Sequence, residues 1–336
     1  MRVLITGGNG YIGSHTCIEL LAAGHAVTIV DNLSNSSPAV VERIARIAGR
    51  QPEFHQLDVR DAAGLERLFA RQAFDALIHF AGVKAVAESV ADPLKYYSNN
   101  VCGSALLFDA ALRHGVTRLV FSSSATVYGE AARSPIGEDA PLAPANPYGR
   151  SKRMVEELLA DLCRANPGLR AVALRYFNPV GAHPSGRVGE APGGIPDNLM
   201  PYLCQVAVGR LPELTVFGND YPTPDGTAIR DYIHVVDLAQ GHLKAFDYLE
   251  REGGMHFINL GTGRGTSVLE LLAAFERVNG VRIPHRLGAR RPGDTTETYA
   301  DAARAAQQLG WSTRLSLEDM CRDAWCWQKL NPAGYA

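Results

Sequence analysis

Short apolar runs alternate with amphipathic stretches through the first half of the chain. The runs are rich in β-branched residues and lack polar alternation, which is typical of strands covered on both faces. They predict strands at 3–6, 26–30, 54–57, 76–80, 119–122 and 171–174. The stretches between them predict helices at 11–23, 39–48, 62–71, 93–113 and 148–164. This alternation predicts an α/β fold with a parallel, doubly wound sheet and right-handed crossovers.

The alternation stops near Tyr176. Residues 178–232 are rich in Pro, Gly, Asn and Asp, and only 198–208 has a convincing helical pattern. Later helices are expected at 236–249, 268–278, 302–309 and 316–329, with a short strand at 256–260. A chain of 336 residues exceeds the usual domain size of about 100–200 residues. We therefore expect a first domain over 1–180, joined by a returning segment near 233–260, and a smaller α/β domain over 181–336.

Composition narrows the class of protein. Apolar residues make up 46% and charged residues 20%, which supplies a core and excludes disordered, collagen-like and coiled-coil classes. The formal charge of −2, without a basic stripe, argues against a nucleic-acid partner. No segment approaches the roughly 18 apolar residues of a membrane span, and the first residues lack the apolar core of a secretory signal. The six cysteines are scattered without CxxC or zinc spacing, so we expect reduced thiols, no metal and a cytoplasmic location.

A glycine-rich turn separates the first predicted strand from the first helix. It reads Gly-Gly-Asn-Gly-Tyr-Ile-Gly over residues 7–13. The missing side chains let a pyrophosphate approach the amides of the helix N-terminus, where the helix dipole favours anions. Asp31 ends the next strand, eighteen residues past Gly13. A carboxylate there can accept hydrogen bonds from ribose hydroxyls and repel a 2′-phosphate, so the pattern favours NAD over NADP.

Two further strand ends belong to the same predicted Rossmann crevice. Asp58 follows the third strand, where a short acid can face adenine. Residues 79–82 close the fourth, and the small Ala81 and Gly82 leave room for a cofactor. Lys84, one of only five lysines, stands just beyond and can reach a phosphate. Taken alone, each of these residues is equally consistent with a structural role.

Tyr148 and Lys152 are four residues apart, on one face of a helix that Pro147 begins. The preceding strand ends in three serines, Ser122 to Ser124. A nearby ammonium and a positive nicotinamide ring would stabilise a phenolate and lower the pKa of the tyrosine from about 10. Tyr148 as acid–base, Lys152 as electrostatic partner and Ser124 as orienting hydroxyl form a self-consistent site for hydride transfer. The alternative is a Tyr–Lys pair on a surface helix.

Together these motifs resemble the short-chain dehydrogenase/reductase superfamily in its extended branch, and within it the UDP-glucose 4-epimerase family. The resemblance covers essentially the whole chain and is carried by residues 31–33, 79–82, 121–129, 175–181 and 230–235. It implies a redox-neutral isomerase of galactose metabolism that retains NAD and passes through a 4-keto sugar. It also implies a homodimer formed through the helices at 93–113 and 148–164.

The resemblance also assigns binding residues. It implies cofactor contacts for Gly7, Gly10, Tyr11, Ile12, Gly13, Asp31, Asn32, Asn35, Asp58, Val59, Phe80, Ala81, Gly82, Lys84, Asn99, Ser122, Tyr176 and Phe177. It implies contacts to a UDP-sugar substrate for Asn178, Asn198, Leu199, Phe217, Arg230, Tyr232, Arg291, Asp294 and Thr298. This set is chemically sensible, because two arginines can clamp a diphosphate and a carboxylate can accept from ribose hydroxyls.

One position of the sugar pocket departs from a common form of the family pattern. Four residues past Asp294, a large aromatic residue resembles members restricted to UDP-glucose and UDP-galactose, and this chain has Thr298 there. A small residue resembles members that also accept UDP-N-acetylglucosamine and UDP-N-acetylgalactosamine. The open alternative is that the segment is shifted by one residue, so that Tyr299 fills the pocket.

Two other functions compete with this interpretation. A nucleotide-sugar 4,6-dehydratase needs a carboxylate beside the orienting hydroxyl, and the chain offers Ser124-Ala125-Thr126 instead. A non-catalytic NAD-binding regulator would be expected to lose Tyr148 or Lys152, and both are present.

Overall fold

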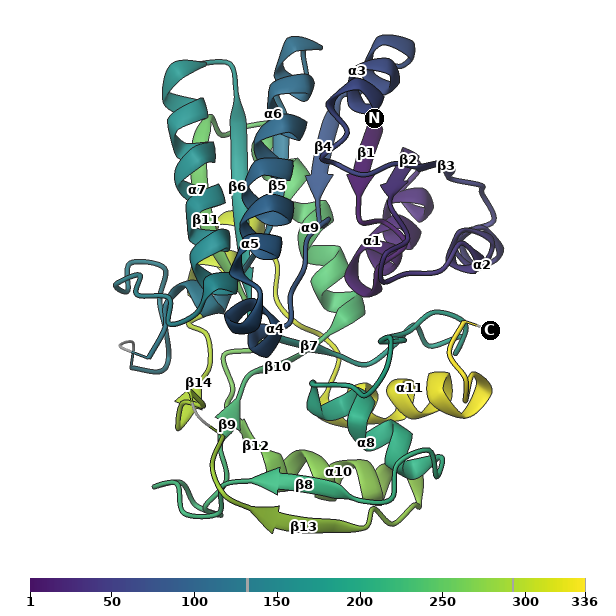
Figure 1. The fold of residues 1–336 in the computed structure, drawn as a ribbon, viewed down its shortest axis with the longest axis vertical. Coiled ribbons are helices and arrows are strands. Elements are labelled where there is room, and N and C mark those ends of the chain that lie inside the picture. Colours follow the sequence, from purple (N-terminus) through teal and green to yellow (C-terminus); the bar gives the residue numbers. More distant parts are fainter. Residues whose placement is uncertain (131–132, 292, 336) are drawn as a thin grey trace.

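A seven-stranded parallel sheet forms the centre of the computed structural model, which describes residues 1–130, 133–291 and 293–335 (Figure 1). Its strands are β1 (Arg2–Thr6), β2 (Ala26–Asp31), β3 (Glu53–Gln56), β4 (Ala76–His79), β5 (Arg118–Ser124), β6 (Arg170–Tyr176) and β11 (Gly254–Leu260). They lie in the order β11-β6-β5-β4-β1-β2-β3, and every neighbouring pair is parallel. The predicted doubly wound α/β fold is confirmed.

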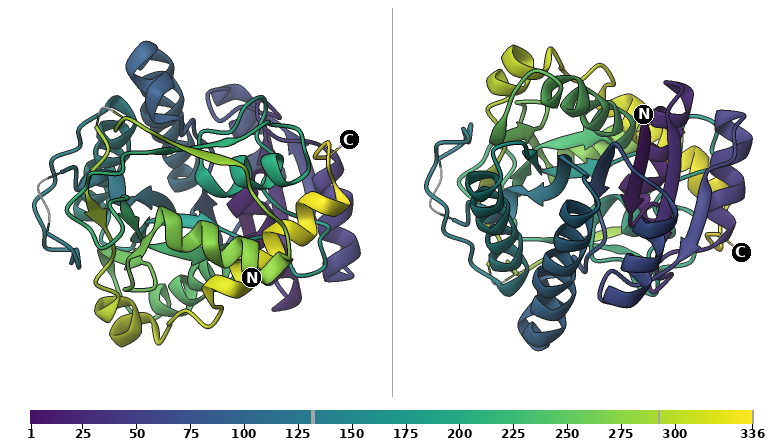
Figure 2. Two further views of the ribbon diagram at one scale, coloured as in Figure 1. Left: turned by 90° about the horizontal axis from the view of Figure 1, so that it is seen from below. Right: turned by 90° about the horizontal axis from the view of Figure 1, so that it is seen from above.

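Helices cover both faces of this sheet (Figure 2). One face packs against α1 (Tyr11–Ala22), α2 (Ala39–Ala48) and α9 (Val235–Leu249), and the other against α3 (Ala62–Arg71), α6 (Gly103–Arg113) and α7 (Pro147–Ala165). Alternate residues of β1 serve the two faces, because Val3 and Ile5 belong to the first core and Leu4 to the second. Burial on both sides explains the unbroken apolar runs of the sequence.

The direction of strand order reverses between β1 and β4. The chain builds outward from β1 to β3, and then from β4 to β6 on the other side. In such sheets the carboxyl ends of the strands at the reversal form a binding crevice. The glycine turn after β1, Asp31 at the end of β2 and the serines at the end of β5 therefore lie along one edge.

Beyond this edge lies a C-terminal lobe of small sheets and three helices, seen in the lower half of Figure 1. Its sheets pair β7 (Asn178–Val180) with β10 (Tyr232–His234), β8 (Leu214–Phe217) with β13 (His285–Gly288), and β9 (Ile229–Arg230) with both β12 (Thr266–Ser267) and β14 (Glu297–Thr298). Its helices are α8 (Leu199–Ala207), α10 (Val268–Asn279) and α11 (Leu317–Leu330). Between β10 and β12 the chain returns to the large sheet as α9 and β11. The division into 1–180 and 181–336 stays a prediction.

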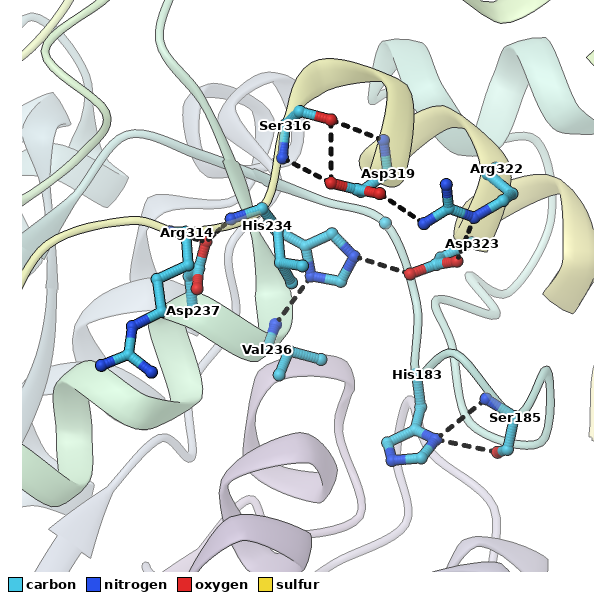
Figure 3. A network of polar contacts seen from close by, with 12 residues as sticks. His183, Ser185, His234, Val236, Asp237, Arg314, Ser316, Asp319, Arg322 and Asp323 are labelled. Carbon is cyan, nitrogen blue, oxygen red and sulfur yellow. Dashed lines mark hydrogen bonds and ion pairs between the residues drawn. The ribbon is translucent and has the colours of Figure 1, made fainter. Parts of the chain in front are cut away.

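A cluster of buried polar contacts connects the C-terminal lobe to α9, which covers the large sheet (Figure 3). Because His234 Nδ1 accepts a hydrogen bond from Val236 N, its Nε2 carries the proton and donates to Asp323 of α11, at 3.2 Å. Asp237, in the first turn of α9, accepts from the backbone amides of Arg314 and Leu315, both at 2.9 Å. These contacts fix the segment before α11 relative to α9.

The structure differs from the predicted elements in several places. Strands β7, β8, β9 and β10 lie in a region for which only one helix was predicted. The helix expected over 93–113 is α5 (Pro93–Tyr96), a π-helical turn (Tyr97–Cys102) and α6. Helix α4 (Val86–Ala91) was not expected, because its apolar residues are largely exposed and give no core-facing pattern. The helix expected over 302–309 is mostly a π-helical turn, Ala305–Leu309. Wide turns of this kind often mark functional sites, and the first one carries Asn100, described below.

Candidate active site

Glycine is required on steric grounds in the turn between β1 and α1. Gly7 has φ +73°, and a Cβ on it would lie 2.7 Å from Ala81 N. A Cβ on Gly13 would lie 2.3 Å from Gly7 O. Gly10, which precedes α1, offers no side-chain cap, so the first amides of the helix are left for another acceptor. Asn9 Oδ1 is also buried without a hydrogen-bond partner among the described residues.

Two carboxylates at the ends of β2 and β3 already have partners within the protein. Asp31 accepts from Asn9 N at 3.1 Å, from Leu33 N at 2.9 Å and from the Ser36 hydroxyl at 2.8 Å. Asp31 therefore stabilises the glycine turn, and it stands where a hydrogen-bond acceptor for the ribose hydroxyls is expected. Asp58 binds the guanidinium of Arg60 through both oxygens, at 2.9 and 2.8 Å. That guanidinium, with the Asn32 amide, holds the pKa of Asp58 well below its usual range.

Tyr148 occupies the second position of α7, and local sequence sets its place. The side chain of Asn146 caps the helix by accepting from Gly149 N at 2.9 Å, and Pro147 has the backbone angle of a first helical residue. One turn later, Lys152 Nζ donates to Ser122 O at 2.6 Å and lies 5.9 Å from the Tyr148 ring centroid. The structure thus brings α7 against the end of β5.

Burial and neighbouring charges give Tyr148 and Lys152 distinct electrostatic environments. Burial raises the pKa of Tyr148, while a hydrogen bond with Ser124 and the charge of Lys84 pull it down. Burial lowers the pKa of Lys152 to about 8, against the opposing charge of Glu156. The sequence predicted Lys152 as the cation that tunes Tyr148. The charge of Lys84, in the loop after β4, acts on the pKa of Tyr148 in the same direction, and the tuning role of Lys152 stays a prediction.

Two residues that were not predicted from the sequence hold this loop. Asn100, in the π-helical turn, accepts from Val83 N at 2.9 Å and donates to Val83 O and Ser151 Oγ, both at 3.0 Å. The predicted residue Asn99, next to it, donates instead to Lys95 O of α5. Glu190 accepts from Lys84 Nζ at 3.0 Å. An available signal for Asn100 was the pair of asparagines, which are poor helix formers, inside a helical pattern.

The remaining predicted cofactor residues lie near the carboxyl ends of the strands. Tyr11 donates to Gly181 O at 2.7 Å, and this links α1 to the C-terminal lobe. The Tyr176 hydroxyl binds Ser122 Oγ. Of the other predicted positions, Val59 and Phe177 are buried, Ile12, Phe80 and Ala81 are half-buried, and Asn35 and Gly82 are exposed.

A second cluster forms in the C-terminal lobe from residues far apart in sequence. Arg230 donates to Thr295 O at 2.9 Å and lies 3.9 Å from Asp294 Oδ1. Arg291 donates to Asp294 at 3.0 Å, and its guanidinium lies 5.0 Å from the ring centroid of Phe217. Burial raises the pKa of Tyr232 to about 12, although both arginines oppose this shift. The predicted nucleotide residues therefore meet, although Pro292 of their motif lies outside the described residues.

Strand β14 bears on the choice between Thr298 and Tyr299. Thr298 is in register with Arg230 on β9, and residues in register point to the same face. The Thr298 hydroxyl lies 2.7 Å from that of Thr295. Tyr299 lies beside Gly265, where an added Cβ would be 3.1 Å from its ring. This arrangement favours Thr298 as the side chain on the face of Arg230.

Two predicted substrate residues lie at the start of α8, one just before it and one as its first residue, and a third lies on β7. Asn178 is in register with Tyr232. Asn198, which precedes α8, donates to Glu190 at 3.3 Å, and Leu199 is half-buried beside it. Within the described part of the chain, no helix has the length and apolar character needed to cross a membrane.

Comparisons with known proteins agree with this geometry. The model of the NAD dependent epimerase/dehydratase family matches residues 3–261. The UDP-glucose 4-epimerase of Bacillus subtilis (strain 168) is 54% identical over 335 residues, which is 100% of this chain and 99% of the relative. The crystal structure of UDP-glucose-4-epimerase from Stenotrophomonas maltophila, with bound NAD and formylated UDP-arabinopyranose, has a TM-score of 0.97 at 53% identity over 99% of both chains. That of the Bifidobacterium longum enzyme in complex with NAD+ and UDP has a TM-score of 0.96 at 50% identity, covering 99% of this chain and 100% of that one.

Proposed function

Because the chain belongs to the NAD dependent epimerase/dehydratase family, we propose that it interconverts UDP-glucose and UDP-galactose in a redox-neutral reaction that uses bound NAD. It is an isomerase. The main support for this function is that Tyr148 and Lys152 lie against the end of β5. This is the same carboxyl edge of the sheet at which the glycine turn lies.

The residues at this edge fit a dinucleotide. Gly7, Gly10 and Gly13 form a cradle that added Cβ atoms would fill or distort, the first amides of α1 are uncapped, and Asn9 Oδ1 lacks a partner among the described residues. These amides would hold the pyrophosphate, and Asp31 would accept from the adenosine ribose. NAD bound there would supply a reversible hydride acceptor for C4 of the sugar.

The protein supplies proton transfer and positioning. The Tyr148 oxygen takes the proton of the sugar 4-hydroxyl and later gives it back. Ser124 binds the same sugar oxygen, and Lys152 keeps a positive charge beside the phenol ring. Arg230 and Arg291 hold the diphosphate while the 4-keto sugar turns over about its phosphate linkage. Anchoring the nucleotide in the C-terminal lobe thus lets either face of the sugar meet Tyr148.

Thr298 supports a broader substrate range, extending to UDP-N-acetylglucosamine and UDP-N-acetylgalactosamine. An acetamido group is bulkier than a hydroxyl, and forcing it against a large side chain costs about 1–3 kcal/mol of overpacking. Threonine leaves this space open, and its register with Arg230 places it on the face of the diphosphate clamp.

The competing functions lack the same support. A 4,6-dehydratase needs an acid next to the orienting hydroxyl, and here the neighbour of Ser124 Oγ is the Thr126 hydroxyl, at 3.0 Å. A non-catalytic NAD-binding regulator gives no reason to bury Lys152 against Tyr148, because burying a lysine charge costs free energy.

Exposed apolar side chains support a homodimer. Val86, Val90, Leu94, Leu106 and Met154 are exposed on α4, α5, α6 and α7, and Leu94 is 77% exposed. These are the helices expected to form the interface, together with α4. A Leu94→Glu protein should shift from dimer to monomer in analytical ultracentrifugation. We place the enzyme in the cytoplasm, which the free state of all six cysteines supports.

The decisive experiment is an activity assay without added reductant or cofactor. Purified protein should interconvert UDP-glucose and UDP-galactose, and denaturation should release NAD in near-equal amount to protein. Formation of a 4-keto-6-deoxy sugar as the stable product would establish a dehydratase instead. Bound NAD with no turnover of any UDP-sugar would establish a regulator.

A further inference from the structure

The Glu190 carboxylate joins two residues assigned to different ligands. Its Oε1 accepts from Lys84 Nζ at 3.0 Å and from Asn198 Nδ2 at 3.3 Å. Lys84 follows β4 of the large sheet, whereas Asn198 precedes α8 of the C-terminal lobe. The Glu190 side chain is only 12% exposed, while that of Lys84 is 52% exposed. One shielded oxygen therefore connects the two sides of the crevice.

The backbone around Glu190 is held firmly from α11 and the segment after it. Trp327 Nε1 donates to Glu190 O at 3.1 Å, and the Tyr335 hydroxyl bonds to the backbone of Gly189. A Cβ on Gly189 would lie 2.3 Å from the Trp327 ring. Trp327 and Tyr335 therefore hold the backbone from which the Glu190 side chain extends.

The charge of Glu190 acts on Lys84, and the charge of Lys84 acts on Tyr148. Glu190 is the largest influence that raises the pKa of Lys84, and Lys84 in turn lowers the pKa of Tyr148. The other titratable or charged groups around these residues come from α1, α5, α7, β6 and α8. They are Tyr11, Tyr96, Lys152, Tyr176 and Cys204.

We propose that Glu190 is a positioning residue for the reaction, holding Lys84 and Asn198 with one oxygen and setting the positive charge that Tyr148 meets. This proposal rests on the proposed function. While the carboxylate is in place, Lys84 is partly neutralised and Tyr148 meets less than a full positive charge. The same contact fixes the start of α8, where the nucleotide residue Asn198 stands.

Glu190→Gln separates the two roles. Glutamine keeps a carbonyl acceptor for Asn198 but removes the negative charge. Lys84 then acts on Tyr148 uncompensated and stabilises the phenolate, so the acid limb of the kcat/KM profile should move to lower pH by about 0.3–1 unit. The KM for UDP-glucose should change little. Glu190→Ala removes both contacts and should add a rise in KM of about 3–10-fold, the worth of one hydrogen bond.

The Lys84→Met background tests whether the effect passes through Lys84. In that background Glu190→Gln should cause no further shift of the acid limb, because the interaction energy belongs to the pair. Ionisation of Tyr148 is also measured without turnover, as the near-ultraviolet tyrosinate signal of the NAD-loaded protein minus that of its Tyr148→Phe counterpart. The same shift should appear there. Glu42→Gln, which breaks the exposed Arg46 pair on α2, serves as the matched control and should leave both profiles in place.

Two outcomes would overturn the proposal. A Glu190→Gln protein with lower activity but an unmoved acid limb would show a merely structural residue. A shift that persists in the Lys84→Met background would show that Lys84 does not transmit it. Absence of epimerase activity in the wild-type protein would refute the proposed function instead, and the tyrosinate titration would still decide the role of Glu190.

Discussion

Replacing Lys152 with Met should stabilise the protein at neutral pH and remove most of its activity. Lys152 is 5% exposed, and burial lowers the pKa of its ammonium from 10.5 to about 8. At 1.36 kcal/mol per pKa unit, holding the charged form in the fold costs about 3 kcal/mol. Met leaves Ser122 O without its donor, which costs about 1–3 kcal/mol. The expected net gain is about 1 kcal/mol near pH 7.

The pH dependence of this gain identifies its cause. The folded-state pKa of Lys152 lies below the unfolded-state value of 10.5. The cost is therefore fully present below about pH 8 and is lost as the pH rises toward about 10.5. Near pH 9.5 only about 1 kcal/mol of it remains, so the lost hydrogen bond to Ser122 should make the Met variant equal to or less stable than wild type.

Urea unfolding at pH 7 and near pH 9.5 measures both values. Protein freed of dinucleotide should be used, so that a change in NAD affinity does not enter the free energy of unfolding. Lys244→Met, which removes an exposed lysine paired with Asp247, should change stability by less than about 0.5 kcal/mol at either pH. A Lys152→Met protein that is destabilised equally at both pH values would refute the reasoning, because Lys152 would then carry no burial cost. Retention of near wild-type turnover would remove it from the mechanism.

Three further predictions concern catalysis, the cofactor and the substrate. Tyr148→Phe should lower turnover by about 10²–10⁴-fold with unchanged NAD content, as measured by steady-state kinetics and extraction, and activity within a few-fold of wild type would exclude it as the acid–base. Gly7→Ala should yield protein with little bound dinucleotide, because its Cβ would lie 2.7 Å from Ala81 N, and full NAD content would contradict the cradle. Wild type should epimerise UDP-N-acetylglucosamine, and Thr298→Tyr should selectively remove that activity. Equal loss on UDP-glucose would show that Thr298 does not select the substrate.

The sequence was most informative where one local rule decides the structure. The runs around Val3 and Ile29 had to be doubly covered parallel strands, and parallel strands bring their ends to a common edge. Gly7, Asp31 and Tyr148 could therefore be assigned to one crevice without knowledge of any distance. Pro147 likewise predicted the start of α7 to within one residue.

Features set by contacts distant in sequence could not be predicted. Glu190 is 106 residues from Lys84, and a single acidic residue in a Pro- and Gly-rich loop has no pattern that names its partner. The π-helical turn around Asn100 has helical segments on either side, so the pattern predicted one continuous helix. The effect of burial on the pKa of Tyr148 also depends on packing, which residue identity alone does not give.

The return of β11 to the large sheet affects how the chain can fold during synthesis. Strand β6 pairs with β11 along its whole length, from Arg170 with Gly254 to Tyr176 with Leu260. When Tyr176 leaves the ribosome, that edge of β6 is an open row of backbone donors and acceptors, a template for unwanted pairing. Its partner is complete only at Leu260, which at about 5–20 residues per second is roughly 4–17 seconds later. A nascent chain of this protein therefore passes several seconds with its largest sheet unfinished, the interval in which a chaperone that covers strand edges would matter most.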